Sequence, residues 1–467
     1  MKKLLFAVSV LAAAAGFAAS PKYVFLFIGD GMSTPQRMVA EEFSRKSGQG
    51  SLAMNAMPFQ ATTRTCSANS LVTDSAAAAT AIACGAKTYN GASGVDKDRK
   101  PVFSCALAAK EAGKKVGILS TVTITHATPA GFYAHRESRG DTYGIALDLV
   151  NSGFDLFAGG GLDGKFDDKK AKEYATCGNA YDYAAKRGYR IVTTKADYLA
   201  LKPGEKVLTR FTDGALLTAI DITDDTYPTL AELVGKAIEL LDNEKGFFMM
   251  AEGGRIDWAG HANDAATNLR DVLALDAAVK VALAFQEKHP DETLVVVTGD
   301  HETGGMSMGF SGTGYALFMD RLANQTMSVD KFDSEFKALL KANPAMTFDD
   351  AKPLFKKAFG FKFEGNAKED AMVVRPDELN ELQKAFDHDV AYYRAKVVEN
   401  KKYDGEKRYL LGGACRIVMS HKCGIGWSSG AHTAMPVLTT AKGCGAELFC
   451  GFIENTDISK KMKELVK

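Results

Sequence analysis

Five short apolar segments, spread along most of the chain, constrain the fold more than any other feature of the sequence. Most have the length and branched side chains of buried strands, and several run into glycine turns. Helical patterns alternate with them, most clearly at residues 228–246 and 263–288, where apolar residues recur every three or four positions. The sequence therefore predicts an α/β fold with a mostly parallel central sheet sandwiched between helices. The five segments are YVFLFIGDG (23–31), KKVGILSTV (114–122), DLFAGGG (155–161), FFMMAEGG (247–254) and TLVVVTGDH (293–301).

A different pattern occupies about residues 305–412. Its lysine-rich amphipathic segments, such as 333–342 and 376–400, predict helices without a strong strand. The apolar runs CRIVMS (415–420) and ELFCGFIEN (447–455) then indicate that the strands resume. We therefore expect one large domain over residues 19–467, interrupted by a helical insertion at about 305–412.

The first 18 residues have the pattern of a secretory signal peptide. Two lysines precede an apolar run that ends in small residues, and no later segment is long and apolar enough to span a membrane. We expect a periplasmic or secreted protein with no membrane span once this segment is removed. Export would allow the eight cysteines to form disulfides, but buried thiols are an equal alternative in a chain with so large a core.

The balance of charge narrows the class of partner. The chain has 57 basic and 57 acidic residues, without long blocks of one sign. A nucleic-acid-binding surface needs a basic excess or patch, so no nucleic-acid partner is predicted. A small-molecule substrate is the better expectation.

Metal-ligand side chains follow four of the predicted strands. Because the carboxyl ends of parallel strands meet at one edge of a sheet, these side chains should lie close together. Carboxylates, imidazoles and hydroxyls of this kind bind divalent cations. An aspartate in such a position can also be a simple helix cap, but the number of coincidences favours metals. The residues are Asp30, His126, Thr128, Glu252, Asp300 and His301.

Two further segments supply candidate ligands. In EGGRIDWAGH (252–261), Asp257 and His261 are four residues apart and share one face if the segment is helical, which makes a plausible zinc pair. In SSGAHTAMP (428–436), His432 lies in a glycine-flanked loop. Taken alone, His432 is more simply an ordinary surface or core histidine.

Ser75 lies at a predicted helix start. The segment LVTDSAAAATAIACG (71–85) offers Thr73 or Asp74 as the cap, with Ser75 in the first turn. Free N–H groups at such an end attract a phosphate, which Ser75 would then face. A serine hydroxyl alone is a poor nucleophile, and a coordinated Zn²⁺ could activate it by lowering its pKa.

Six motifs in order resemble the alkaline phosphatase family, from about Tyr23 to the C-terminus. The resemblance implies hydrolysis of phosphate monoesters through a phosphoserine, with two Zn²⁺ and one Mg²⁺ per chain, in a homodimer. Residues 305–412 would be the variable part. The motifs are FIGDGM (27–32), VTDSAAAATA (72–81), HATPAGFYAHRESR (126–139), EGGRIDWAGH (252–261), VTGDHETGG (297–305) and SGAHT (429–433).

The resemblance also implies a role for each site residue. Ser75 would be the nucleophile and Arg139 would grip the phosphate, although sequence alone would make Arg139 an ordinary surface residue. Asp30, Asp300 and His301 would hold the zinc that activates Ser75, and Ser75 would itself be among the metal-binding residues. Asp257, His261 and His432 would hold the zinc that receives the leaving oxygen. Asp30, Thr128 and Glu252 would hold the magnesium.

Two positions depart from some bacterial relatives. His126 and Trp258 stand where those proteins carry aspartate and lysine, which puts the identity of the third metal and the affinity for phosphate in doubt. We interpret His126 as a neighbour of the ligands and not as one of them. The alternatives are a phosphodiesterase or sulfatase on the same scaffold, an exported phosphate- or metal-binding protein without turnover, and a partner-binding function of the insertion.

Overall fold

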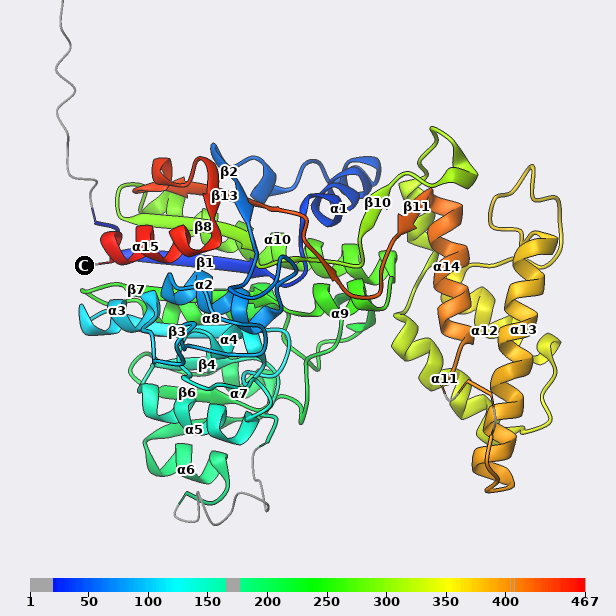
Figure 1. Ribbon diagram of the computed structural model, residues 1–467, viewed down its shortest axis with the longest axis horizontal. Coiled ribbons are helices and arrows are strands. Elements are labelled where there is room, and N and C mark those ends of the chain that lie inside the picture. The colour runs from blue at the N-terminus through cyan, green and yellow to red at the C-terminus, as the bar shows by residue number, and fades with distance from the viewer. Residues whose placement is uncertain (1–19, 165–176, 404, 407, 467) are drawn as a thin grey trace, which may run out of the picture.

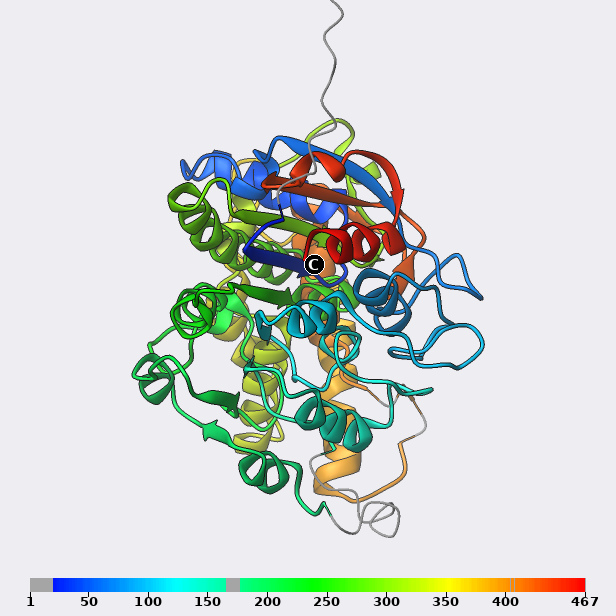
Figure 2. The same ribbon diagram turned by 90° about the vertical axis from the view of Figure 1, so that its left-hand side faces the viewer.

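The central feature of the computed structural model is a ten-stranded, mostly parallel sheet with helices on both faces (Figures 1 and 2). The structure describes residues 20–164, 177–403, 405–406 and 408–466. The strands lie in the order β14-β2-β13-β8-β1-β7-β3-β4-β6-β5, and only β13 runs antiparallel to its neighbours. Their bounds are β1 Tyr23–Gly29, β2 Phe59–Arg64, β3 Lys115–Ser120, β4 Leu156–Ala158, β5 Tyr189–Val192, β6 Lys206–Thr209, β7 Phe247–Gly253, β8 Thr293–Gly299, β13 Val437–Gly443 and β14 Gly451–Glu454. The α/β fold class and the five predicted strands are confirmed.

Alternation along the strands divides the core between the two faces of the sheet. In β1, Phe25 and Phe27 face one side, while Leu26 and Ile28 face the other. The first side is covered by α1 Thr34–Lys46, α7 Lys195–Leu199, α8 Leu230–Leu241, α9 Arg255–His261 and α10 Ala265–Lys288. The second is covered by α2 Ser75–Cys84, α3 Cys105–Glu111, α4 Ala127–Ala130, α5 Thr142–Ser152, α6 Ala180–Lys186 and α15 Asn455–Leu465.

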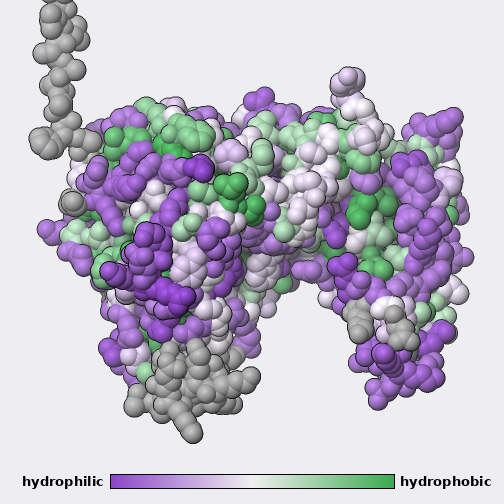
Figure 3. Space-filling view, in the orientation of Figure 1, coloured by the Kyte–Doolittle hydropathy of each residue, from purple (hydrophilic) through white to green (hydrophobic). Residues whose placement is uncertain are grey.

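Four helices extend from one end of this sheet-containing body, and we call residues 329–423 the arm. The arm connects to the body at the top of the view and leaves a wide hollow beside α5 and α6 (Figures 1 and 3). Its helices pack on a core of phenylalanines and leucines that includes Phe332, Phe355 and Leu382. They are α11 Val329–Ala342, α12 Phe348–Phe359, α13 Pro376–Tyr393 and α14 Leu411–Cys423.

One strand prediction is wrong. The CRIVMS run lies inside α14 and is helical, so the arm continues to Cys423 before strands resume. The buried residues of α14 include Leu411, Cys415, Met419 and Cys423, which recur every four positions, a helical spacing. A short apolar run with branched side chains has the same signal in a buried helix and in a strand. The second run, ELFCGFIEN, does contain strand β14.

The chain returns to the same sheet after the arm. β13 pairs with β8, the last long strand before the arm. Two short antiparallel ribbons also pair segments that precede the arm with segments that follow it. These ribbons pair β9 Glu302–Thr303 with β12 His432–Thr433, and β10 Met306–Met308 with β11 Ile425–Trp427. We interpret the arm as an insertion into one domain on this ground.

Two other expectations concern the chain ends and the cysteines. The signal-peptide segment lies outside the described residues, and within residues 20–164, 177–403, 405–406 and 408–466 no helix has the length and apolar character to cross a membrane. Free thiols are found at Cys66, Cys84, Cys105, Cys415, Cys423 and Cys450. Burial raises the pKa of Cys84 and of Cys105 to about 12, which keeps both as unreactive thiols.

Candidate active site

The predicted ligand residues meet at one edge of the sheet because three central strands end at the same level. β1 pairs in parallel with β7 and β8, and Gly29 lies opposite both Gly253 and Gly299. Asp30 and Asp300 each follow directly, and Glu252 lies one residue earlier in its strand. All three carboxylates are buried. The strand ends therefore concentrate negative charge in one place, as the sequence predicted.

Helix α2 points its N-terminal end at these carboxylates. Asp74 is the N-cap and accepts a hydrogen bond from the Ala77 N–H at 3.0 Å, so the predicted cap is confirmed. Ser75 is the first residue of the helix, and its Oγ lies 3.2 Å from Nε2 of the buried His301. The first N–H groups of a helix lack partners within it, so Ser75 lies where an anion is favoured.

One cluster gathers around His301. Its Nε2 lies 3.3 Å from Asp30 Oδ1 and 3.3 Å from Asp300 Oδ2. The other Asp300 oxygen accepts hydrogen bonds from the N–H groups of Gly31 and His301, at 3.0 and 2.8 Å. These bonds fix the carboxylate so that Oδ2 faces the cluster. The three residues can hold a cation with a mixed nitrogen and oxygen donor set.

A second cluster contains Asp257, His261 and His432. The Nε2 atoms of the two histidines lie 3.1 Å apart, and each lies 3.5 Å from an Asp257 oxygen. His261 Nδ1 donates to the Gly430 carbonyl and His432 Nδ1 donates to the Thr73 carbonyl, at 2.8 and 2.9 Å. Each Nε2 is then left with a lone pair directed at the other, an arrangement that a cation between them stabilises.

A third cluster joins Asp30, Glu252 and His126. Thr128, in α4, donates to Asp30 Oδ2 at 3.3 Å, and Ser120 donates to Glu252 Oε2 at 2.5 Å. His126 Nδ1 lies 3.9 Å from Asp30 Oδ2, close enough to serve as a ligand together with Glu252. The sequence interpretation left His126 out of the ligand set, and this geometry makes it a candidate.

The electrostatics of the edge point to cations. Asp30 Oδ1, Glu252 Oε1, Asp300 Oδ2 and His126 Nδ1 are buried without a hydrogen-bond partner. Burial raises the pKa of Glu252 to about 8 and that of Asp300 to about 7. It raises the pKa of Asp30 well above its usual range, and neighbouring carboxyls, Asp300 first, add to the effect. Carboxylates this crowded need a compensating positive charge to ionise together.

The histidine cluster has the opposite balance. Burial would raise the pKa of Asp257, but the hydrogen bond to His432 and the nearby imidazoles outweigh it and hold that pKa well below its usual range. Burial would lower the pKa of His432, and its contact with Asp257 reverses the shift. Burial keeps His301 neutral by lowering its pKa well below the usual range. A neutral imidazole is the form that binds metals.

Arg139 lies over the N-terminal end of α2. Its Nη1 donates to Asp74 Oδ2 at 3.0 Å, and its Nη2 lies 3.2 Å from His126 Nε2. Burial and this arginine lower the pKa of His126 to about 4, so the imidazole is neutral. About a third of the Arg139 side chain is exposed.

Sequence reasoning missed residues that hold the ligands in place. Thr303 Oγ1 donates to Asp257 Oδ1 at 2.5 Å and lies 3.3 Å from His301 Nδ1, so it contacts both clusters. Glu302 is buried and accepts hydrogen bonds from Gln36 and Thr433, the residue after His432. Only the adjacency of Glu302 and Thr303 to His301 could have suggested them, because their partners lie far away in the sequence.

Comparison with known proteins identifies the chain's relatives. A family model described as alkaline phosphatase matches residues 21–467. Alkaline phosphatase 3 of Bacillus subtilis is 34% identical over 452 residues, 94% of this chain and 88% of that protein. The cold-active alkaline phosphatase of Shewanella sp. has a TM-score of 0.78 at 29% identity and covers 95% of this chain and 100% of that one. A variant of the alkaline phosphatase from the Antarctic bacterium TAB5, with Mg bound in its M3 site, has a TM-score of 0.66 at 27% identity and covers 96% and 99%.

Proposed function

The chain belongs to the alkaline phosphatase family, and on that premise we propose that it hydrolyses phosphate monoesters through a phosphorylated Ser75. The observation that carries the proposal is the position of the Ser75 hydroxyl. It lies at the anion-attracting end of α2 and 3.2 Å from Nε2 of His301, a member of the first cluster of ligand-type side chains. The family makes the chain a phosphatase, and we propose the phosphoserine intermediate and the metal ions in addition.

We propose two zinc ions and one magnesium ion. Asp30, Asp300 and His301 would hold one zinc, and Asp257, His261 and His432 the other, because both sets mix carboxylate and imidazole. Asp30, Thr128 and Glu252 would hold magnesium through oxygen, with His126 as an additional neighbour. When bound, such ions lower the pKa of a hydroxyl and stabilise the attacking and leaving oxygens of an in-line displacement. The unpartnered carboxylate oxygens support this assignment.

The chain's own residues account for the remaining steps. The Ser75 hydroxyl loses its proton and Oγ attacks phosphorus, while the ester P–O bond breaks and the alcohol leaves with a proton. Water then attacks the phosphoserine, which releases inorganic phosphate and restores the Ser75 hydroxyl. Arg139 binds two phosphate oxygens through its planar guanidinium, and Asp74 and His126 hold it in place.

Export and dimerisation remain proposals. We propose that the protein acts in the periplasm or outside the cell, because the first 18 residues have the pattern of a signal peptide. We propose a homodimer by analogy with the family that the sequence resembles. Cell fractionation and the molar mass of the purified protein in solution test these two proposals separately.

The experiment that tests the nucleophile is Ser75→Ala, with Ser104→Ala as the matched control. Ser104 is also a serine at a helix start, because it is the N-cap of α3, but it belongs to none of the three clusters. We expect Ser75→Ala to lower the rate on an aryl phosphate at least about 10³-fold with zinc content unchanged, and Ser104→Ala to keep normal turnover. Wild-type protein quenched in acid should carry one phosphate on Ser75. Substantial turnover by Ser75→Ala would contradict the assignment, and zinc and phosphate binding without turnover in the wild type would favour the binding protein.

A further inference from the structure

The junction between α9 and α10 connects the arm to the histidine cluster. Asp257 and His261 belong to α9, and the junction residues 262–264 follow His261 directly. The arm contacts this junction although it lies far away in the sequence. We propose that Arg416 of the arm is a positioning residue, which fixes the end of α9 and so holds the His261 imidazole at its cation site. The inference rests on the proposed function, since that function assigns His261 as a zinc ligand.

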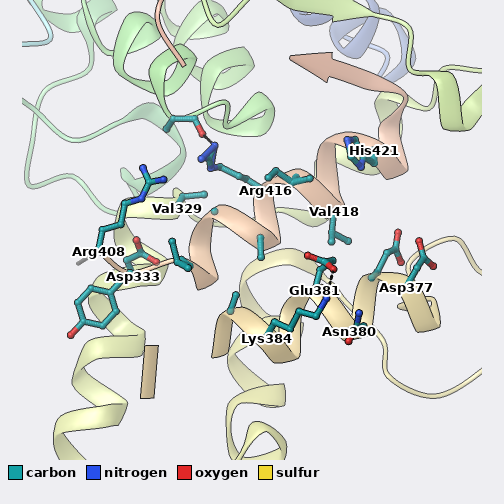
Figure 4. Close-up of a pocket in the computed structure, with 18 of the residues that line it drawn as sticks. Val329, Asp333, Asp377, Asn380, Glu381, Lys384, Arg408, Arg416, Val418 and His421 are labelled. Atoms are coloured by element: carbon teal, nitrogen blue, oxygen red, sulfur yellow. Dashed lines mark hydrogen bonds and ion pairs between the residues drawn. The ribbon is translucent and has the colours of Figure 1, made fainter. Parts of the chain in front are cut away.

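Arg416 reaches out of the arm to the backbone of α9. Its side chain projects from α14 toward the helices of the body (Figure 4), and its Nη1 donates a hydrogen bond to the Ala262 carbonyl. Ala262 is the C-cap of α9. The last carbonyls of a helix have no partner within the helix and carry partial negative charge, so a guanidinium is well suited to this position. The contact joins residues 154 positions apart in the chain.

A second set of contacts anchors the other side of the junction. Asp264 is buried and caps α10 through the Thr267 N–H. Its carboxylate also accepts hydrogen bonds from Gln325 Nε2 at 2.8 Å and from the Val329 N–H at 3.0 Å. Val329 begins the first helix of the arm. The arm therefore holds the junction both at the Ala262 carbonyl and at the Asp264 carboxylate.

The junction in turn contacts the loop that carries His432. Asn263 has a φ of +50°, in the left-handed region, and its Nδ2 donates to the carbonyls of Gly260 and Ser429. His261 Nδ1 donates to the next carbonyl in that loop, at Gly430. Any displacement of the junction would therefore move the two Nε2 atoms that now lie 3.1 Å apart.

His261 is the member of its cluster with the least support from the body. Its side chain is 41% exposed, against 14% for His432 and 6% for Asp257. Its orientation depends on the bond to Gly430 and on the backbone of α9, of which His261 is the last residue. Arg416 does not contact Ser75, so its effect would pass only through this backbone.

A cavity beside Arg416 makes the role testable by chemical rescue. It has a volume of about 710 Å³, and Ala262, Arg408 and Arg416 are among its lining residues (Figure 4). A guanidinium ion can therefore reach the Ala262 carbonyl when the Arg416 side chain has been truncated. The test is the rate at which the zinc-loaded protein, without substrate, releases Zn²⁺ to a chelating dye.

We expect Arg416→Ala to release one of two zinc ions about tenfold faster than wild type, the size of effect typical of residues that orient a ligand. Guanidinium chloride, below the concentration that unfolds wild type, should restore the slow release. Arg408→Ala, which changes an exposed arginine of the same cavity, should behave as wild type. If Arg416→Ala does not fold, Arg416→Gln, which is too short to keep the contact, replaces it with the same expectations.

Three results would overturn the proposal. They are unchanged zinc release in the Arg416 variant, faster release that guanidinium does not reverse, and equal acceleration in Lys422→Met, which weakens the arm without touching the junction. Failure of the proposed function would look different. It would appear as a wild-type protein that binds zinc but does not hydrolyse aryl phosphate, and the zinc-release comparison could still be made on it.

Discussion

The strand-end edge and the arm both bury charged side chains, but they compensate that charge in opposite ways. In the arm, Lys422 donates to Glu378 at 2.8 Å, and Arg375 lies 2.9 Å from the other Glu378 oxygen. Asp389 is fully buried and accepts hydrogen bonds from the N–H groups of Leu410 and Leu411. At the edge, one oxygen of each of Asp30, Glu252 and Asp300 has no hydrogen-bond partner, and among the described residues no lysine or arginine forms an ion pair with these carboxylates.

This difference in pairing distinguishes buried charges that stabilise the fold from buried charges that serve a function. A buried ion is expensive, so a fold that needs it for stability alone supplies the partner from within. The arm follows this rule. Within the described part of the chain, the edge has no such partner for its carboxylates, so a bound cation would have to neutralise them. Until a cation binds, the burial of these carboxylates lowers the stability of the fold.

Removing one carboxylate from the edge should abolish most of the function. We expect Asp300→Asn to lose one zinc per chain and to hydrolyse aryl phosphate about 10³-fold more slowly, because a ligand charge has gone. Asp389→Asn, the matched change in the arm, should leave zinc content and turnover unchanged. Metal analysis and steady-state kinetics measure both, and normal activity in Asp300→Asn would contradict the ligand assignment.

The same substitution should have opposite effects on stability in the two regions. Glu378→Gln leaves Lys422 buried without its counter-charge and should cost about 3 kcal/mol in unfolding free energy. Glu252→Gln relieves crowding and should stabilise the metal-free protein by about 1 kcal/mol at pH 8. Denaturant unfolding of metal-free protein measures both values. A loss of stability in both variants would refute the contrast.

Thr303→Val tests the hydrogen bond behind the histidine cluster. The variant keeps the shape of the side chain but cannot donate to Asp257. We expect zinc affinity to fall about 10- to 100-fold while the arm is unaffected. Competition with a chelator of known affinity measures this loss. Thr326→Val, an exposed threonine hydroxyl that donates to the Lys357 carbonyl, serves as the control.

The smallest effect concerns pH. In the metal-free protein the raised pKa values of Glu252, about 8, and Asp300, about 7, mean that the folded state holds protons that the unfolded chain releases near pH 4. The stability from these groups is full below pH 4 and is lost as the pH rises to about 8. We expect the thermal midpoint of chelator-treated protein to fall by a few degrees between pH 5 and 8, and the zinc-loaded protein to show no such fall. Parallel curves would contradict this.

The sequence predicted the edge well because the edge is built from local rules. Asp30 and Asp300 directly follow apolar strands, and parallel strands end together, so their side chains could be brought together before the structure was known. Ser75 followed from its helix start and from the family resemblance. His126 was left out of the ligand set because its distance from Glu252 and Asp30 depends on how α4 packs, which no local pattern encodes.

The arm and its contacts were harder to predict. Its helices were expected from their periodicity, but the sixth predicted strand is part of α14. The contact of Arg416 with Ala262 and that of Thr303 with Asp257 join distant segments. Such contacts depend on tertiary packing, and an arginine or a threonine in the sequence gives no sign of its partner.

The matched ends of β1, β7 and β8 also limit how the sequence of such a site can evolve. One residue advances a strand by about 3.3 Å and turns the next side chain to the opposite face of the sheet. A deletion within β1 would therefore move Asp30 out of reach of His301, and a deletion within β8 would move Asp300 and His301 together away from Asp30, whereas a substitution leaves the spacing intact. We expect insertions and deletions among related chains to collect in the arm and in loops, and the strands leading to Asp30, Glu252 and Asp300 to keep a constant length.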